Sequence, residues 1–578
     1  MTSHIRRRIV SGAAAPLGAS LHPVLQRVYA ARGVQAAAEL SVALDSLLPV
    51  STLECVDAAV ELLVRQRAGG RVLVIGDFDA DGATSTALMV RALRAWSFAA
   101  VDFLVPNRFE FGYGLTPEIV ALAATRSPTL IVTVDNGISS VAGVQAARER
   151  GIDVLVTDHH LPGAQLPAAN VIVNPNLGGS LFRSRALAGV GVAFYVIAAL
   201  KHRLDMEGAV SREAPGAAAY LDLVALGTVA DLVPLDTNNR VLVAQGLRRI
   251  RAGRCVAGIR ALLAVAERGV VDLTAADLAF AVAPRLNAAG RLDDMTVGIQ
   301  CLLADDPTEA LALARRLDEL NQERRAIEAR MQAEALAAVR SLRDPLLQRE
   351  TRCALTLFDA SWHQGVVGLV ASRVKDRTGR PVIAFARAAD GRLRGSARSV
   401  PGLHIRDVLD AIATRHPELI SRFGGHAMAA GLTLDAERLD RFAQAFDEEV
   451  ARCLPADRER DCIETDGELA VHEIALETAA ALRAGGPWGQ AFPEPRFDGL
   501  FSVRNARTVG ERHLKMWVEV PASGRAFDAI AFNHLEAGAG EEYAPLPAGA
   551  ARLVYRLDIN EYQGERRLQL LVDHVLPP

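Results

Sequence analysis

Short hydrophobic runs alternate with amphipathic segments between about residues 71 and 235. The segments Ala83–Trp96 and Val141–Glu149 have helical periodicity and separate these runs. The runs are RVLVIGD (71–77), TLIVTVDNG (129–137), DVLVTDHH (153–160) and NVIVNPN (170–176). Continuous apolar strands that alternate with helices predict a parallel sheet covered on both faces.

A further, mostly apolar run occupies residues 219–235, AYLDLVALGTVADLVPL. Its residues 221–230 lead directly into an acid, Asp231. We interpret this run as another strand of the same sheet, so that Asp231 follows a strand end.

The pattern changes between about residues 305 and 345. Apolar residues recur at spacings of three and four, and no Gly or Pro occurs between Pro307 and Pro345. This spacing predicts a long amphipathic helix that connects two domains. Its charges of both signs are typical of a solvated helix face.

A second α/β unit follows, and the chain then becomes β-rich. CALTLFD (353–359) and PVIAFA (381–386) have the pattern of strands, and GVVGLVASRVKDRTG (365–379) has the pattern of a helix. The charged segment Arg452–Cys462 marks the next boundary. Beyond it, runs such as KMWVEV (515–520) and RLVYRLDI (552–559) predict a small β-barrel or sandwich.

The length of 578 residues suggests about three or four domains. We divide the chain into an N-terminal segment (1–50), a first α/β domain (51–304), a connecting helix (305–348), a second α/β domain (349–458) and a C-terminal β domain (459–578).

The composition indicates a globular cytoplasmic protein. Half of the residues are hydrophobic, and the net charge of −4 requires any nucleic-acid partner to bind local basic patches. Six cysteines without a CxxC pair argue against zinc ribbons and disulfides. The basic N-terminus lacks a convincing signal-peptide core, and no apolar run approaches the ~18–20 residues of a membrane span. We therefore expect no membrane association.

Acidic side chains follow the hydrophobic runs of the first α/β domain. They are Asp77, Asp79 and Asp81 in GDFDADG, Asp135 in VDNG, Asp158 beside His159 and His160, and Asp231. Because the carboxyl ends of parallel strands share one edge of a sheet, these residues are expected to converge. Carboxylates gathered without a counter-charge repel one another, and a multivalent cation relieves that repulsion.

The ligand types favour a divalent ion of hard to borderline character. Mg²⁺ prefers oxygen ligands, so the histidines shift the expectation toward Mn²⁺, with Mg²⁺ as the alternative. The candidate ligands outnumber what one ion needs, and two ions about 3.5–4 Å apart would use them. Such a pair suits hydrolysis at a phosphoryl centre.

Each motif alone also has a structural interpretation. GDFDADG begins like an EF-hand loop, but Leu88 stands where the bidentate Glu would be. Asp135-Asn136-Gly137 is a common turn sequence, Asp231 can be a helix cap, and a histidine pair is often structural. The recurrence of acids after four runs of one domain favours the metal site.

The motifs GDFDADG, VDNG, TDHH and GTVAD (227–231) occur in an order that resembles the DHH phosphoesterase superfamily. Further segments resemble its RecJ family of single-strand-specific 5′→3′ DNA exonucleases. These are HPVLQRVYAARGV (22–34), VPNRFEFGYGL (105–115), APRLNAAGR (283–291), WHQGVVGLVASR (362–373), GSARS (395–399) and FGGHAMAAG (423–431). The sequence departs from the family pattern at GPWGQAFPEP (486–495).

The resemblance implies roles for individual residues. Metal ligands would be Asp77, Asp79, Asp81, Asp135, His159 and Asp231, with Asp135 bridging two ions. His160 would lie at the phosphate or the bridging water, and Asp158 would orient a neighbouring imidazole. The first α/β domain would be the DHH catalytic domain.

The second α/β domain would be the DHH-associated domain, which holds substrate phosphate. Its candidate substrate-binding residues are Arg398, Ser399, Gly424, Gly425 and His426. Arginine forks bind phosphate, and glycine pairs let backbone N–H groups approach it. Arg108, Arg285 and Asn287 are further phosphate or sugar candidates, and Arg285 can equally be a structural ion-pair partner.

The C-terminal domain resembles an oligonucleotide-binding barrel. Its segment VRNARTVGERHLKMW (503–517) carries Arg504, Arg507, Arg512 and Lys515 against one acid, Glu511. Phe501 and Trp517 flank this segment. Basic and aromatic residues together suit single strands, although a solvated barrel face with core aromatics would give the same pattern.

The sequence thus predicts a two-metal exonuclease that releases mononucleotides from single-stranded DNA in recombination and repair. A DHH-family phosphodiesterase acting on short oligonucleotides and a non-catalytic single-strand-binding scaffold are the alternatives. The C-terminal barrel favours a polymer substrate. The resemblance adds a single-strand-binding protein and recombination or mismatch-repair factors as partners, and we expect a monomer.

Overall fold

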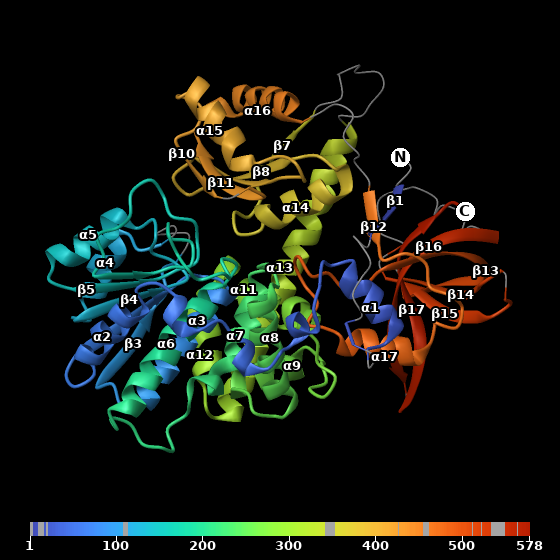
Figure 1. Ribbon diagram of the computed structural model, residues 1–578. Helices are drawn as coiled ribbons and strands as arrows, with labels where there is room; N and C mark the ends of the chain where they lie inside the picture. Colours follow the sequence, from blue (N-terminus) through green and yellow to red (C-terminus); the bar gives the residue numbers. More distant parts are fainter. Residues whose placement is uncertain are drawn as a thin grey trace. The chain divides into compact units, whose positions relative to one another are not determined.

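The computed structural model describes residues 4–9, 17–18, 21–107, 114–341, 353–425, 427–454, 462–510, 513–521, 523–532, 534, 549–562 and 564–578 (Figure 1). Two compact units divide the chain. One is built around Gln322–Glu464, and the other combines Arg7–Asn321 with Thr465–Leu535 and Pro545–Pro578. In the described part of the chain, no helix has the length and apolar character needed to cross a bilayer.

A five-stranded parallel sheet forms the first α/β domain, in the order β3-β2-β4-β5-β6 (Figure 1). The strands are β2 (Arg71–Gly76), β3 (Ala100–Leu104), β4 (Leu130–Val134), β5 (Asp153–Thr157) and β6 (Val171–Val173). The strands predicted from RVLVIGD, TLIVTVDNG, DVLVTDHH and NVIVNPN are confirmed as β2, β4, β5 and β6. Strand β3 was not predicted, because this edge strand is only partly buried and carries an exposed Asp102.

Helices cover both faces of this sheet, as its continuous apolar strands predict. Alternate strand residues pack on α4 (Pro117–Ala124) and α5 (Val141–Glu149) on one face. The opposite face packs on α2 (Val56–Gln66), α3 (Ala80–Ala95) and α6 (Gly189–Met206). The remaining helices up to residue 303 are α7 (Leu221–Ala230), α8 (Thr237–Arg251), α9 (Ala257–Val265), α10 (Ala275–Asp277), α11 (Ala283–Leu292) and α12 (Thr296–Leu303).

The interpretation of residues 221–230 as a strand is wrong. They form α7, and its residues from Leu221 to Val229 are all buried. A helix that is buried on every side shows no amphipathic period, so its apolar run is indistinguishable from a buried strand. Asp231 is the C-cap residue of α7, and it still reaches the edge of the sheet where the other acids lie.

The predicted connecting helix is α13 (Pro307–Ser341). It leads into the unit around Gln322–Glu464, whose sheet has the order β10-β11-β9-β8-β7. The strands are β7 (Leu355–Phe358), β8 (Val382–Arg387), β9 (Leu393–Arg398), β10 (Arg422–Gly425) and β11 (Ala429–Leu434). β7 and β8 pair in parallel, and the other neighbouring strands of this sheet pair antiparallel. The helices are α14 (Val367–Thr378), α15 (Ile405–Arg415) and α16 (Leu439–Cys453).

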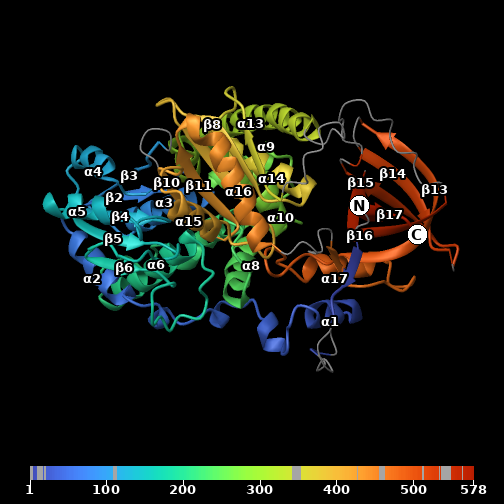
Figure 2. The ribbon, with the colours of Figure 1, turned by 90° about the horizontal axis from the view of Figure 1, so that it is seen from above.

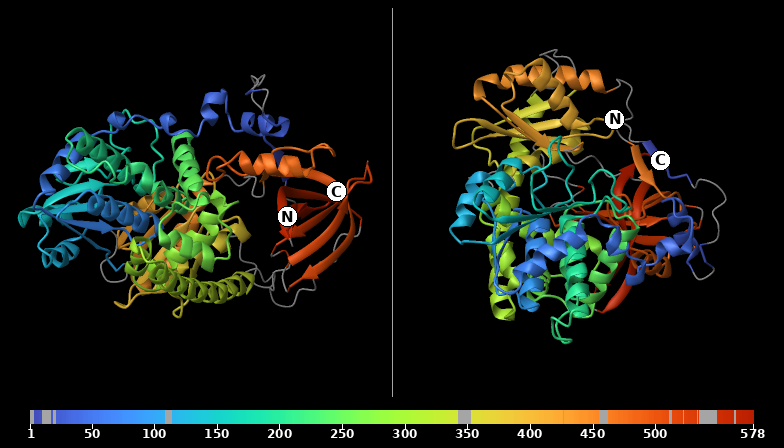
Figure 3. Two further views of the ribbon diagram at one scale, coloured as in Figure 1. Left: turned by 90° about the horizontal axis from the view of Figure 1, so that it is seen from below. Right: turned by 60° about the vertical axis from the view of Figure 1, so that its left-hand side comes forward.

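The C-terminal domain is a closed barrel, which settles the choice between barrel and sandwich (Figure 3). Its strand order is β13-β14-β15-β17-β16, and the helix α17 (Leu476–Ala484) precedes it. The strands are β13 (Phe497–Val509), β14 (His513–Glu519), β15 (Ala526–Ala531), β16 (Gly549–Tyr562) and β17 (Glu565–Leu576). Phe497, Phe501 and Tyr555 are buried in its core.

The N-terminal segment packs on the C-terminal domain. Its helix α1 (Pro23–Ala30) runs beside α17 (Figure 2). Tyr29 stacks near Trp488 and Phe492, and its hydroxyl donates to the carbonyl of Gly485. Two short strands, β1 (His4–Arg7) and β12 (Cys462–Thr465), also pair. Residues from both ends of the chain therefore share one core.

Candidate metal centre

The loop between β2 and α3 carries three of the candidate ligands. Asp79 is the N-cap of α3, and its Oδ1 accepts the N–H groups of Asp81 and Gly82, each at 3.0 Å. Gly82 is required by packing, because a Cβ there would lie 2.5 Å from the carbonyl oxygen of Asp77. The helix start thus bends the chain tightly and turns Asp77, Asp79 and Asp81 toward the sheet edge.

Asp81 is held by the N-terminus of α6. Its two carboxylate oxygens accept the N–H groups of Gly189 at 2.6 Å and Val190 at 2.9 Å. A helix N-terminus favours negative charge, so this contact stabilises the carboxylate form of a fully buried acid. This support was not predicted, although the Gly-Val-Gly start of α6 (189–191) is a signal in the sequence.

Asp135 follows β4 in a left-handed backbone conformation, with φ at 61°. Such a conformation is uncommon outside glycine and persists only where neighbours hold it. The side-chain amide of Asn136 donates to the carbonyls of Ile75 and Val134, which ties the turn to the ends of β2 and β4. A Cβ at Gly189 would lie 2.6 Å from Cβ of Asp135, so this glycine lets α6 approach the acid.

The DHH motif after β5 separates into distinct positions. The carboxylate of Asp158 is buried and accepts N–H groups from Ile138, His159 and His160. Its Oδ1 also lies 2.8 Å from Nδ1 of His160. Nε2 of His159 lies 3.1 Å from Oδ1 of Asp135 and 3.5 Å from Oδ2 of Asp231.

The candidate ligands converge in three overlapping groups. Within each group, one donor atom per residue lies within 4.8 Å of the others. The groups are Asp77, Asp79 and Asp135; Asp81, His159 and Asp231; and Asp135, His159 and His160. The shared membership of Asp135 and His159 makes these groups one continuous cluster.

The electrostatics of this cluster favour a cation. Burial and the neighbouring Asp79 raise the pKa of Asp81 to about 7. Burial and repulsion from Asp81 and Asp79 raise the pKa values of Asp135 and Asp231 well above their ordinary range. Carboxylates that are held together at such a cost, beside an imidazole, match the donors of a divalent ion such as Mn²⁺ or Mg²⁺.

His160 and Asp158 show the opposite electrostatic behaviour. Burial opposes the charge of His160, but its hydrogen bond to Asp158 and the negative charges of Asp158, Asp231 and Asp77 together raise the pKa of the imidazole to about 9. Burial likewise opposes the charge of Asp158, but the hydrogen bond and charge of His160, together with the N–H of Ile138, lower the pKa of that carboxyl. The pair is therefore a charged imidazolium and carboxylate at neutral pH, with Nδ1 of His160 directed at Asp158.

Two residues of α11 have contacts within the same unit. Nε of Arg285 donates to Oδ1 of Asp318 at 2.8 Å, the structural pairing considered as one alternative. Oδ1 of Asn287 accepts the N–H of Ala80 at 2.9 Å, between two candidate ligands. Two other candidates, Arg108 and His426, lie outside the described residues.

The candidate phosphate-binding residues of the second α/β domain lie around β9 and β10. Nη1 of Arg398 donates to Oγ of Ser396 and to the carbonyl of Ala397. A Cβ at Gly368, in the first turn of α14, would lie 2.7 Å from Nη2 of Arg398. Arg398 thus lies against the N-terminus of α14. The guanidinium and the helix N-terminus both favour an anion.

The other three candidates of this unit differ in exposure. Ser399 is buried and donates its hydroxyl to the carbonyl of Leu403 at 2.7 Å. Gly424 faces open space, since a Cβ there would have no neighbour within 4 Å. Gly425 adopts φ of 140°, and a Cβ there would collide with the carbonyl oxygen of Ala429. Gly424 is therefore the position where a ligand could approach the backbone.

The barrel separates the aromatic candidates. Phe501 is 1% exposed and belongs to the core, whereas Trp517 on β14 is 50% exposed. Phe532, which directly follows β15, is 56% exposed and packs edge-on against His513. Strand register places Arg507 opposite Lys515 on the face that carries Trp517.

The remaining basic candidates of the barrel are partly paired. Arg504 pairs with Glu519, and Lys515 lies 3.2 Å from Asp528. Glu511 and Arg512 lie outside the described residues. Phe532 and His513 were not predicted as site residues, because their shared face follows from the register between strands.

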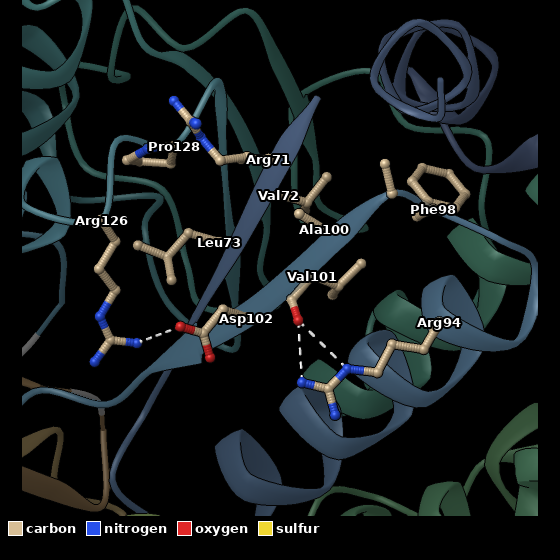
Figure 4. Close-up of a pocket in the computed structure, with 11 residues that line it drawn as sticks. Arg71, Val72, Leu73, Arg94, Phe98, Ala100, Val101, Asp102, Arg126 and Pro128 are labelled. Atoms are coloured by element: carbon tan, nitrogen blue, oxygen red, sulfur yellow. Dashed lines mark hydrogen bonds and ion pairs between the residues drawn. The ribbon is translucent and has the colours of Figure 1, made fainter. Parts of the chain in front are cut away.

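A separate hollow of about 490 Å³ opens where β2 and β3 begin, at the strand ends opposite the candidate metal ligands (Figure 4). Its arginines have structural partners. Arg94 donates to the carbonyl of Val101, and Arg126 donates to Asp102 and to the carbonyl of Phe103. Arginine side chains thereby cover part of the edge of β3, which protects an edge strand from pairing with other chains.

Three family models match the chain. They are the DHH family N-terminal domain at residues 71–228, the DHHA1 domain at 351–452 and the RecJ OB domain at 465–574. The single-stranded-DNA-specific exonuclease RecJ of Dickeya dadantii is 52% identical over 585 residues and covers 100% of both chains. The Escherichia coli protein of the same name is 52% identical over 581 residues, or 99% of both chains.

Solved structures agree with these matches. The crystal structure of Thermus thermophilus RecJ in complex with Mn²⁺ has a TM-score of 0.77 at 31% identity, covering 96% of this chain and 76% of that one. The complex with Mg²⁺ has a TM-score of 0.72 at 29% identity, covering 96% and 75%. Sequence, fold and the carboxylate–imidazole cluster together show that the chain belongs to the RecJ family.

Proposed function

We propose that this protein is a metal-dependent exonuclease that hydrolyses single-stranded DNA from its 5′ end and releases mononucleotides. The convergence of five acids and His159 at one sheet edge is the observation that carries the proposal. The relatives in the family are named single-stranded-DNA-specific exonucleases, which supports the same activity and substrate here.

Six residues would hold two divalent ions, with Mn²⁺ preferred and Mg²⁺ as the alternative. They are Asp77, Asp79, Asp81, Asp135, His159 and Asp231. When bound, the ions would neutralise the carboxylates, polarise the scissile phosphodiester and lower the pKa of a water. Asp135 is our choice for the bridging ligand, since its oxygens belong to two of the three ligand groups.

His160 and Asp158 would complete the chemistry. Because Asp158 keeps the imidazole charged near neutral pH, Nε2 of His160 can donate a hydrogen bond to a phosphate oxygen. That hydrogen bond would strengthen as negative charge develops on the phosphoryl oxygens. Asp158 would orient the ring without touching the substrate.

Residues of the second α/β domain and residues of the barrel would bind the single-stranded DNA. Arg398 beside the α14 N-terminus and the backbone at Gly424 suit a phosphate group. Trp517, Phe532 and Arg507 present aromatic and cationic groups on the side of the barrel formed by β13, β14 and β15, which suits stacked bases and a charged backbone. Single-strand-binding protein and recombination or mismatch-repair factors are proposed partners, with the protein acting as a cytoplasmic monomer.

End-labelled DNA tests the activity and its direction. The wild-type protein with Mn²⁺ should release mononucleotides from 5′-phosphorylated single strands, and a matched duplex should be resistant. Label at the 5′ end should appear in mononucleotides at once, whereas 3′ label should stay in shortening strands. The reverse order would contradict the polarity.

Two further comparisons test the mechanism and the substrate length. Asp135→Ala should abolish the release of mononucleotides. Asp153→Ala should not, because Asp153 lies at the start of β5, at the opposite strand end from the DHH motif. Undiminished release by Asp135→Ala would exclude the metal assignment. In a length series, activity confined to di- and trinucleotides would favour the short-oligonucleotide phosphodiesterase.

A further inference from the structure

The start of α3 depends on a side chain more than two hundred residues away. The first N–H groups of a helix have no acceptor within the helix. Asp79 accepts those of Asp81 and Gly82, and the N–H of Ala80 donates instead to Oδ1 of Asn287 on α11, at 2.9 Å. Among the described residues, the acceptor of the Ala80 N–H is therefore a side chain of another helix.

Gly290 makes a second contact with the same loop. A Cβ at this position would lie 1.7 Å from the carbonyl oxygen of Phe78. Asn287 and Gly290 are three residues apart, so they share one face of α11. That face meets the loop at Phe78 and Ala80, the residues on either side of Asp79.

The other side of α11 is anchored. Arg285 donates from Nε to Asp318 on α13 and from Nη1 to the carbonyl of Ala281. Ala281 lies in a single π-helical turn, Leu278–Val282, that leads directly into α11. Such turns are rare, and they are frequent at functional sites. Two residues of the APRLNAAGR motif, Arg285 and Asn287, thus contact different elements.

We infer that α11 is a brace for the metal-binding loop and that Asn287 is a positioning residue, holding Asp79 and Asp81 at the geometry that a cation requires. Asn287 acts through the backbone of Ala80, not through the substrate. Residues that orient metal ligands in this way typically change metal affinity about 10–100-fold when removed. The effect on metal binding rests on the proposed function, whereas the order of the loop does not.

Hydrogen–deuterium exchange of the metal-free, full-length protein tests the order of the loop. In Asn287→Ala, peptides covering residues 76–83 should exchange roughly tenfold faster, since one hydrogen bond has been removed. Asn287→Asp keeps an acceptor oxygen at the same position and should retain protection. Gln300→Ala, which removes an exposed amide from the neighbouring α12, is the control and should match the wild type.

Calorimetric titration with Mn²⁺ tests the consequence. Asn287→Ala should weaken Mn²⁺ binding about 10–100-fold, with activity recovering as Mn²⁺ is raised and thermal stability close to that of the wild type. Asn287→Asp should bind Mn²⁺ far better than Asn287→Ala.

Two results would overturn the inference. One is unchanged exchange and Mn²⁺ affinity in Asn287→Ala. The other is a loss of DNA affinity alone, which would assign Asn287 to the substrate. If the wild type released no nucleotides but Asn287→Ala still showed both effects, the brace would stand and the proposed exonuclease activity would fail.

Discussion

Oδ1 of Asp158 and Nδ1 of His160 lie 2.8 Å apart, although only one residue separates them in the chain. The carboxylate also accepts three backbone N–H groups, so its position does not depend on the imidazole of His160. The hydrogen bond fixes which nitrogen of His160 faces the protein. Nε2 then lies on the side of the ring away from Asp158.

Asp158→Asn should remove the charge and keep one oxygen as the acceptor for His160, while its amide nitrogen can no longer accept the N–H of Ile138. The pKa of His160 should fall from about 9 toward its ordinary value of 6.5, so the imidazole becomes largely neutral at pH 8. We expect the alkaline limb of the pH–kcat profile to move to lower pH and kcat at pH 8 to fall about 10–100-fold. Asp153→Asn, at the other end of β5, is the control. An unshifted profile would show that His160 does not act as a charged donor.

The metal-free protein should lose stability as the pH rises from about 6 to 8. The raised pKa values of Asp81, Asp135 and Asp231 mean that the folded state holds protons which the unfolded chain has already lost. His160, with its pKa raised to about 9, contributes in the same direction, since its stabilisation is lost as the pH rises toward that value.

Mn²⁺ should reverse this trend, because it binds the ionised carboxylates and competes with their protons. Thermal unfolding in EDTA and in Mn²⁺, at pH 6 and pH 8, measures both effects. Asp135→Asn should flatten the slope in EDTA by removing one of the repelling charges. A Tm in EDTA that rises over this pH window would contradict the electrostatic account of the cluster.

Trp517→Ala and Phe532→Ala should weaken binding of long single strands. Stacking of a base on an aromatic side chain contributes about 1–3 kcal/mol, so each variant should lose between roughly fivefold and a hundredfold in affinity. Cleavage of trinucleotides should change little if these residues act only on the distal strand. Fluorescence anisotropy at fixed salt measures the affinity.

Phe501→Ala is the matched aromatic control on the same barrel. Phe501 is buried against Tyr555, so its removal should cost about 3–5 kcal/mol of stability. Weakened DNA binding by Trp517→Ala together with an equal loss of stability would show that the exposed aromatic has a structural role instead.

Arg32→Ala should destabilise the contact between the N-terminal segment and the barrel. The side chains of Arg32 and Asp466 are 2% and 1% exposed, and Arg32 also donates to the carbonyl of Pro493. Removal of one partner from a buried ion pair costs about 3–5 kcal/mol. Denaturant unfolding, followed by Trp fluorescence, measures the loss. Arg567→Ala, which breaks an exposed pair with Glu565, should change stability by less than about 1 kcal/mol.

Pattern and chemistry together predicted most of the candidate metal centre. The strands β2, β4 and β5 are continuous apolar runs, and their carboxyl ends must share an edge in a parallel sheet. Asp77 and Asp135 follow those ends directly and His159 is the second residue after β5, so their convergence needed no knowledge of the loops. Asp231 converges with them even though α7, and not a strand, delivers it.

Helix supports were harder to anticipate because their contacts cross large distances in sequence. Gly189 and Asn287 lie more than a hundred residues from the loop they hold, and neither has a charge that marks it. Strand β3 and the exposed face of the barrel were also not predicted from the sequence pattern. Exposure of Trp517 and burial of Phe501 depend on which face of the pleat points into the barrel.

The amino-acid sequence by itself determined the chemical inventory and most of the order of elements: four of the five parallel strands, the acids and histidines near their ends, a long helix and a β-rich end. Tertiary structure alone decided what each side chain touches. Asp158 pairs with His160, Asp81 meets the N-terminus of α6, and Arg285 pairs with Asp318. The physical reason is that periodicity records whether a position is buried, whereas a hydrogen bond depends on which distant segment packs against it.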